Sequence, residues 1–335
     1  MIGSHRAALM STVVLLTFSA SLRAQHPTAD VIVSNPQVFE VTITSKFVVP
    51  EGGRNVTALG VWHALPTPRP WDGLDRTSGA SEISFEPNTG RVQYVGHNDS
   101  QNVNWEVRTG LEPGKTLEFT SRFRVRSVDR NFDAKRSIAR WSDYQRNLDS
   151  VTPRFDDYLD SVVDEIKRGE PPAEAALAFC KWIKEHIAYD ASVPYSPRDL
   201  YAILNHRRGY CGHQLTVFEA MCSRAGIPTR TVWGLNLNTP DGAGALHTIR
   251  PDFENQHTWA RIFLPGSGWV EIDPGMGAKA YFFPAQVIQN NADFQNYVIW
   301  VRENGTWKIA DWEQRGGKWF SPYGIENRRT FRVVQ

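Results

Sequence analysis

Alternating apolar and polar side chains dominate the first third of the chain. From Leu117 to Arg126 the odd-numbered residues are mostly apolar, and the even-numbered residues are polar or charged. This period of two is the geometry of a β-strand with one buried face. A second such run covers residues 39–44, and turn sequences such as Pro87-Asn88-Thr89-Gly90 separate the apolar runs. We therefore expect a small β-sandwich in residues 25–128.

Helical periodicity begins after residues 129–150, a charged stretch that we interpret as a linker. Beyond Pro171-Pro172, apolar residues recur every three or four positions at Phe179, Ile183 and Ile187. This spacing predicts a helix with one buried face. Ser196-Pro197 then carries the start signals of a short second helix, because serine caps well and proline fits the first helical position.

A third helix is predicted to begin at Cys211. The sequence Gly209-Tyr210-Cys211-Gly212 interrupts the chain, and an apolar stripe of helical spacing follows it and ends at Gly226. At a helix start, the unpaired amide groups and the positive end of the dipole favour a thiolate over a thiol. A sulfur nucleophile needs such a place, although a single cysteine there is about as often a buried structural residue.

A β-hairpin is predicted after this helix. His257 opens one strand, Pro265-Gly266-Ser267-Gly268 supplies the turn, and Asp273 closes the second strand. A general base needs a neutral imidazole within reach of the sulfur, and a carboxylate on its other nitrogen fixes the tautomer. The hairpin therefore offers the base and its orienting group for Cys211.

The register of this hairpin tests the assignment. A regular four-residue connection would place His257 and Asp273 on opposite faces of the sheet, because side chains alternate along each strand. A triad therefore requires an odd number of unpaired residues in the connection, or a bulge. With that register Trp259 or Phe263 would help to shield the site from water. Without it, the orienting group would be sought at residues 254–255.

Four sequence blocks resemble the transglutaminase-like core domain over residues 151–274. They are Arg208-Gly209-Tyr210-Cys211-Gly212, Ala225 to Arg230, His257-Thr258-Trp259, and Gly268 to Pro274, in this order. The resemblance implies an α+β fold with a papain-like core, in which a helix bearing the cysteine packs on an antiparallel sheet. It also implies a catalytic triad of Cys211, His257 and Asp273, with no cofactor and no metal. The family includes proteases, amidases, peptide N-glycanases and inactive scaffolds, so the resemblance limits the chemistry more than the substrate.

The expected chemistry is attack of the thiolate on an amide or ester carbonyl to give a thioester. Water or an amine as the acceptor then decides between hydrolysis and cross-linking. The backbone amide of Cys211 is a natural oxyanion donor, and the side chains of Asn205, Gln214 and Tyr189 are open candidates. A catalytically idle module that binds or assembles partners is the alternative, and the intact set of three residues argues against it.

Other histidines and cysteines allow less favoured assignments. His206 and His213 flank Cys211 and could form a metal site with it, but we expect His213 to be solvated or to support the site. His247, in a Gly/Ala loop, could be the base. Cys180 and Cys222 both fall on apolar helical stripes, where two buried thiols are slightly favoured over a disulfide.

Residues 1–24 read as a signal peptide, with Arg6, an apolar run from residue 7 to residue 20, and a small residue before the cut after Ala24. An uncleaved anchor is less favoured because the run is short for a bilayer. The formal charge of +1 becomes 35 minus 36, or −1, once Arg6 and Arg23 are removed. We therefore expect a secreted or periplasmic protein without stable membrane insertion after cleavage. We also expect no nucleic-acid partner and a protein or peptide substrate, with cell-wall peptide as one candidate.

The predicted order of domains is a signal peptide (1–24), a sandwich-like domain (25–128), a linker (129–150), the catalytic domain (151–280) and a β-rich C-terminal extension (281–335). The extension contains Asn304-Gly305, a strong hairpin turn. Four tryptophans lie around it, at positions 300, 307, 312 and 319. Packing within the sheet is favoured for them over a surface that binds saccharides.

Overall fold

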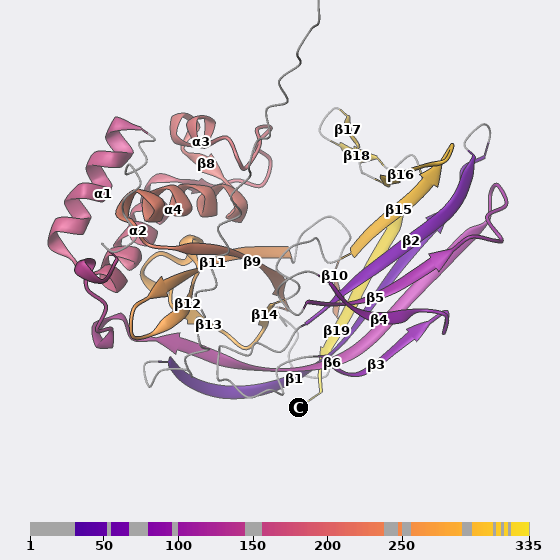
Figure 1. Ribbon diagram of the computed structural model, residues 1–335, viewed down its shortest axis with the longest axis horizontal. Coiled ribbons are helices and arrows are strands. Elements are labelled where there is room, and N and C mark those ends of the chain that lie inside the picture. The colour runs from indigo at the N-terminus through magenta and orange to yellow at the C-terminus, as the bar shows by residue number, and fades with distance from the viewer. Residues whose placement is uncertain are drawn as a thin grey trace, which may run out of the picture.

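Two long antiparallel strands, β1 (Val31–Val48) and β6 (Thr116–Phe132), run beneath both halves of the molecule (Figure 1). The chain is followed in a computed structural model, which describes residues 31–51, 55–66, 80–95, 100–144, 156–237, 247–249, 256–289, 297–310, 313–315, 318–320 and 323–334. The expected signal peptide lies outside these residues. A β-sandwich forms one half, and helices on a sheet form the other.

The sandwich consists of two sheets. In the first, β10, β19, β1 and β6 lie in this order, and β3 pairs with the outer edge of β6; in the second, the order is β16, β15, β2, β5 and β4. Their bounds are β2 (Val56–Leu65), β3 (Ala80–Glu86), β4 (Arg91–Val95), β5 (Ser100–Val107), β10 (His247–Ile249), β15 (Tyr297–Glu303), β16 (Thr306–Ile309) and β19 (Glu326–Val333). Phe39, Phe123, Leu59 and Trp105 are buried in the core of this half, which confirms the predicted sandwich.

The C-terminal strands complete the sandwich. Phe39 of β1 pairs with Val333 of β19, and Leu59 of β2 pairs with Val301 of β15. The strands of the predicted C-terminal extension therefore lie beside strands from the N-terminal region. The predicted hairpin at Asn304-Gly305 is confirmed, because both residues have positive φ values of 51° and 82° and join β15 to β16.

The tryptophans of this region are described only in part. Trp300 packs at 6.1 Å against Trp62 of the neighbouring strand, and Trp307 is 42% exposed. Trp312 and the side chain of Trp319 lie outside the described part of the chain. The contact of Trp300 fits packing within the sheet.

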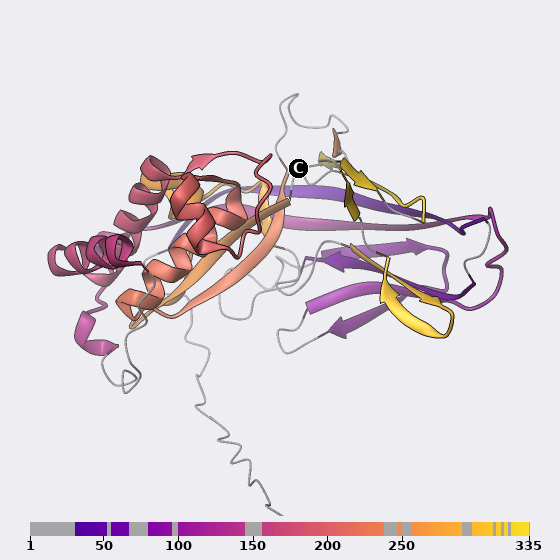
Figure 2. The same cartoon turned by 90° about the horizontal axis from the view of Figure 1, so that it is seen from above.

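The other half places its helices over one face of a four-stranded sheet (Figure 2). The helices are α1 (Asp157–Gly169), α2 (Pro172–His186), α3 (Leu200–His206) and α4 (Cys211–Ala225). The sheet has the order β12 (Gly268–Ile272), β11 (Gln256–Leu264), β9 (Thr229–Asn236) and β14 (Val287–Gln289). Phe218 and Met221 of α4 share one core with Ala260 and Ile262 of β11. The predicted α+β class, with a cysteine-bearing helix on an antiparallel sheet, is confirmed.

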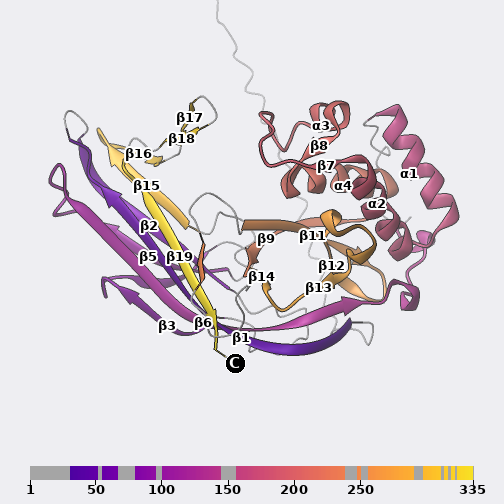
Figure 3. The same ribbon diagram turned by 180° about the vertical axis from the view of Figure 1, so that it is seen from behind.

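Strand β6 connects the two halves directly (Figure 3). Its residues 120–125 pair with β3 of the sandwich, whereas Arg130 and Asn131 pair with β13 (Phe282–Phe283) in the helical half. The expected linker thus begins as a continuation of this strand. It goes on through the short 3₁₀ helices η2 (Ala134–Arg136) and η3 (Trp141–Asp143).

Candidate active site

Cys211 is the first residue of α4, as the sequence predicts. Tyr210 precedes the helix in an extended conformation, and Gly226 ends it with a φ of 87°. The first amide groups of a helix have no carbonyl partner within the helix, so a negative sulfur is stabilised at this position. Cys211 is partly exposed, whereas Cys180 and Cys222 are buried.

The hairpin that carries His257 and Asp273 closes with three residues. Leu264 pairs with Gly268 and Ala260 with Ile272, so residues 265–267 form the connection. Gly266 adopts a φ of 86°, which favours glycine in this tight turn. Continuing this register places Asp273 opposite Trp259, on the face that His257 occupies. The register that a triad requires is confirmed.

Asp273 orients the imidazole of His257. Its Oδ2 lies 2.6 Å from His257 Nε2, while its Oδ1 accepts a 3.0 Å hydrogen bond from the backbone N–H of Gly275. The Asp273 side chain is 7% exposed and also caps the 3₁₀ helix η5 (Pro274–Lys279). With Nε2 engaged in this way, Nδ1 is the ring nitrogen left for the sulfur.

Asp273 and Cys211 together raise the pKa of His257. Burial of the ring lowers the pKa of His257. This effect is outweighed by the charge and hydrogen bond of Asp273 and by the hydrogen bond and charge of Cys211, so the pKa rises from 6.5 to about 10. The histidine is therefore protonated at neutral pH, and Cys211 lies beside it at a helix start, a position that favours a thiolate.

Trp259 packs against the ring of His257. Its indole is fully buried and stacks on the His257 ring, with centroids 5.7 Å apart and planes 28° apart. Of the two residues expected to shield the site, Trp259 thus contacts His257, whereas Phe263 packs at the other end of the hairpin against Trp269.

Sequence comparison identifies the core of the helical half. Residues 160–274, which include Cys211, His257 and Asp273, match the sequence model of the transglutaminase-like superfamily. This segment is a transglutaminase-like core domain.

Two bacterial proteins are similar to this chain at low sequence identity. An uncharacterized protein of Haemophilus influenzae is 25% identical over 270 residues, which is 73% of this chain and 71% of that protein. The protein YebA of Bacillus subtilis is 29% identical over 84 residues, 24% of this chain and 11% of its own. The crystal structure of a proposed cysteine protease from Cytophaga hutchinsonii superimposes with a TM-score of 0.51 at 14% identity, and the match covers 90% of this chain and 99% of that one. This likeness shows a shared fold.

The three candidate oxyanion donors differ in their surroundings within the transglutaminase-like core. Gln214 is buried and its amide donates to the Ile187 carbonyl at 3.1 Å. Asn205 is exposed on α3. Tyr189 is 66% exposed. Partial burial, and after it the charge of Cys211, raise the pKa of its phenol, which places Tyr189 near the sulfur.

His213 supports the start of the cysteine helix and is not solvated. The residue is fully buried; its Nδ1 accepts from the Tyr210 backbone N–H at 3.3 Å, and its Nε2 lies 3.2 Å from the Tyr195 carbonyl. The proton therefore sits on Nε2. Burial lowers the pKa of His213, which keeps the ring neutral. Of the two sequence-based expectations for His213, the structure therefore fits the supporting role and excludes a solvated side chain.

The alternative assignments receive no support from their positions. The backbone of His247 lies on β10, where it pairs with Phe331 of the sandwich rather than in a loop. Cys180 and Cys222 are free, buried thiols, the slightly favoured of the two expectations. In the part of the chain that the structure describes, no three His, Cys, Asp or Glu residues are grouped so as to hold a metal ion.

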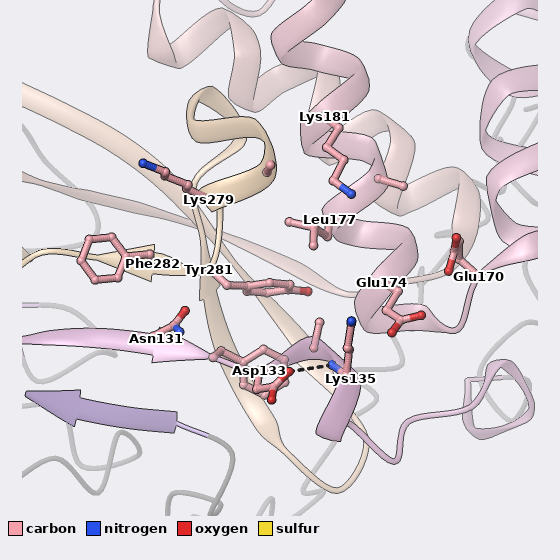
Figure 4. A pocket seen from close by; sticks show the side chains of 14 residues that line it. Asn131, Asp133, Lys135, Glu170, Glu174, Leu177, Lys181, Lys279, Tyr281 and Phe282 are labelled. Atoms are coloured by element: carbon pink, nitrogen blue, oxygen red, sulfur yellow. Dashed lines mark hydrogen bonds between the residues drawn. The ribbon is translucent and has the colours of Figure 1, made fainter.

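One pocket of about 650 Å³ lies away from the triad, where the end of β6 meets α2 (Figure 4). Lys135, Lys181 and Glu174 are among the side chains around it, and Tyr281 lies at its base. The hydroxyl of Tyr281 donates to the Ala173 carbonyl of α2 at 2.8 Å, so the base of this pocket is a fixed contact within the helical half. No triad residue lines it.

None of the described helices is long and apolar enough to cross a membrane.

Proposed function

We propose that this protein is an exported cysteine enzyme that acts on peptide-type amides through a thioester at Cys211. The sulfur attacks the amide carbonyl, and the proton on His257 passes to the leaving amine as the C–N bond breaks. His257 then takes a proton from water or from an amine, which attacks the thioester and releases the sulfur. Hydrolysis or acyl transfer results, according to the acceptor.

The observation that carries this proposal is the His257–Asp273 hydrogen bond of 2.6 Å beside Cys211. Asp273 holds the proton on Nε2 and stabilises the imidazolium, so Nδ1 faces the reaction. A binding module would not need a buried carboxylate held by both oxygens behind a histidine that pairs with a cysteine. The idle-module alternative is therefore the weaker one.

The start of α4 supports the second requirement of acyl transfer, a donor for the oxyanion. Amide groups of His213 and Gln214 bond back to the Tyr210 carbonyl at 2.9 and 3.1 Å. This fold of the first turn leaves the Cys211 N–H at the end of the helix, next to its own sulfur. We assign the Cys211 backbone amide as the oxyanion donor, with the Tyr189 hydroxyl as a candidate second donor.

A protein or peptide is the proposed substrate, and cell-wall peptide is one candidate. The near-zero net charge favours neither nucleic acid nor another polyanion. The description of the Cytophaga hutchinsonii relative as a proposed cysteine protease favours hydrolysis over transfer. The apolar run and small residues of the first 24 positions support export to the periplasm or the medium.

Active-site titration tests the proposal. Iodoacetamide at pH 5.5 should label Cys211 rapidly and stoichiometrically in the native protein, because the helix start and the protonated His257 favour the reactive thiolate form of the sulfur. Cys211→Ala should abolish this labelling and His257→Ala should slow it strongly. Labelling no faster than that of a free cysteine would favour the idle module. A proteomic screen for substrates cleaved or cross-linked by the wild type, but not by Cys211→Ala, would then identify the acyl donor.

A further inference from the structure

A buried ion pair joins the sandwich strand β6 to the catalytic hairpin. Arg130 Nε donates to Glu271 Oε2 at 2.8 Å, and the two side chains are 9% and 11% exposed. The same guanidinium donates to the carbonyls of Val128 and Val287 at 3.1 and 3.3 Å. Arg130 is therefore held by three acceptors, and one of them is the hairpin carboxylate.

The second oxygen of Glu271 continues the connection toward the site. Its Oε1 accepts a 3.1 Å hydrogen bond from the indole N–H of Trp259. The Trp259 ring lies under His257, the proposed base. Glu271 thus bridges the guanidinium of Arg130 on β6 and the indole of Trp259 on β11.

The space around Trp259 leaves the indole little freedom. Gly234 of β9 pairs with His257 of β11. A Cβ atom at this glycine would lie 2.4 Å from the Trp259 ring. Phe283 packs on the indole at 5.7 Å, and the Arg130 guanidinium lies over the Phe283 ring at 5.5 Å. Close packing on these sides leaves the bond to Glu271 to fix how the ring is turned.

We propose that Arg130 is a positioning residue for His257, acting through Glu271 and Trp259, so that strand β6, which runs on from the β-sandwich, is part of the catalytic apparatus. The inference rests on the proposed function of Cys211 and His257. Loss of Arg130 would leave Glu271 buried without its main counter-charge, and the carboxylate would turn toward Arg261, whose Nη2 lies 3.7 Å away. Trp259 would lose its fixed acceptor, and His257 would lose the surface that aligns it with Asp273.

The direction in which the pKa of His257 shifts distinguishes a positioning role of Arg130 from a direct effect of its charge. Removing a positive charge near His257 should raise the pKa of its imidazolium, because a repulsion disappears. Misalignment of His257 from Asp273 should lower that pKa, because Asp273 supplies the largest raising effect. A purely structural role would reduce stability and leave the pKa where it is.

The experiment measures the titration of the His257 ring by NMR in the full chain labelled at histidine, with His257→Gln to assign the signal. Arg130→Gln should lower its pKa by about one unit or more, and Arg130→Lys should restore most of the loss. Trp259→Phe keeps an aromatic ring beneath His257 and leaves the charge of Arg130 in place, but it removes the indole N–H. It should therefore also lower the pKa of His257. This second variant keeps the test decisive if Arg130→Gln does not fold.

Arg224→Gln is the matched control. It breaks another partly buried pair, between Arg224 and Asp164 at 2.6 Å, on the far side of α4. It should leave the His257 titration unchanged. An unchanged or raised pKa in Arg130→Gln, or an unchanged pKa in Trp259→Phe, would overturn the positioning role. Failure of the proposed function would look different: slow alkylation of Cys211 in the wild type, with the order of His257 pKa values among the variants preserved.

Discussion

His257 and Asp273, 16 residues apart, share a 2.6 Å hydrogen bond because the hairpin between them closes with three residues. A closure of four would have turned the two side chains to opposite faces. Whether this turn has an odd or an even number of residues therefore decides whether the base and its orienting group can meet.

Substitutions in the triad should differ in their effects. Cys211→Ala and His257→Ala should abolish turnover while circular dichroism shows an intact fold. Asp273→Asn should leave a small residue of activity, with a loss of up to about 10⁴-fold, because the amide favours the wrong tautomer. It should also lower the pKa of His257 from about 10 toward 6.5, since the Asp273 charge is the largest raising effect. An unchanged rate in any of the three variants would remove that residue from the triad.

The three cysteines should alkylate at very different rates in the native protein. Cys180 and Cys222 are fully buried, and burial raises the pKa of both thiols, so they should react only after unfolding. Cys211, at the start of α4 beside His257, should react first. Mass spectrometry of tryptic peptides after brief labelling measures the three rates. Equal labelling in the folded protein would contradict the expectation, and labelling in urea provides the control.

Stability should depend on pH through His63 in the sandwich core. His63 is fully buried between the hydroxyls of Ser45 and Ser121, both at 2.9 Å, and burial followed by the charge of Arg329 lowers its pKa from 6.5 to about 3. Below pH 6.5 the unfolded chain therefore binds a proton that the folded chain does not. The contribution is fully present above pH 6.5 and is lost at up to about 1.4 kcal/mol per pH unit as the pH falls toward 3.

Urea unfolding of the wild type and of His63→Gln isolates this effect. Glutamine keeps a donor and an acceptor but does not titrate, so its free energy of unfolding should fall less steeply between pH 6.5 and 4. The contribution of His257 is the same in the wild type and in His63→Gln, so it cancels in this comparison. Parallel pH profiles of the two proteins would show that His63 is not held neutral.

Gly234→Ala should damage both stability and the site. The new methyl group would lie 2.3 Å from the Ile288 carbonyl oxygen and 2.4 Å from the Trp259 ring, so the backbone or the indole must move. We expect a loss of about 3 kcal/mol in the free energy of unfolding, together with slower alkylation of Cys211. Gly169→Ala, at the end of α1 with no atom within 4 Å of the new methyl, is the control and should be neutral or slightly stabilising. Equal behaviour of the two variants would contradict the close packing around Trp259.

Local patterns in the sequence were enough to predict the elements of the site. The alternation along β6, the Gly-Tyr-Cys-Gly break before α4 and the apolar strands around residues 265–267 each express a backbone period or a turn preference. Such signals depend on neighbours within a few residues. They predicted that Cys211 starts a helix and that His257 and Asp273 lie on one hairpin.

Longer-range relations could not be predicted in this way. The pairing of Phe39 with Val333 joins strands almost 300 residues apart, and nothing near either residue indicates its partner. The burial of His213 likewise depends on Tyr195, 18 residues earlier, which reaches it only after the chain has folded back. Whether Cys180 and Cys222 stay reduced depends on the distance between two helices.

The candidates for a nucleophile, a base and an orienting carboxylate follow from the order of residues alone, because each needs a particular side chain at the end of a particular element. Their meeting at one site depends on tertiary packing. The three-residue turn places the side chains of His257 and Asp273 on the same face of the hairpin. The buried contact of Arg130 with Glu271 places Trp259 beneath His257. Register and burial arise when distant segments exclude water together, so neither is a property of any one segment.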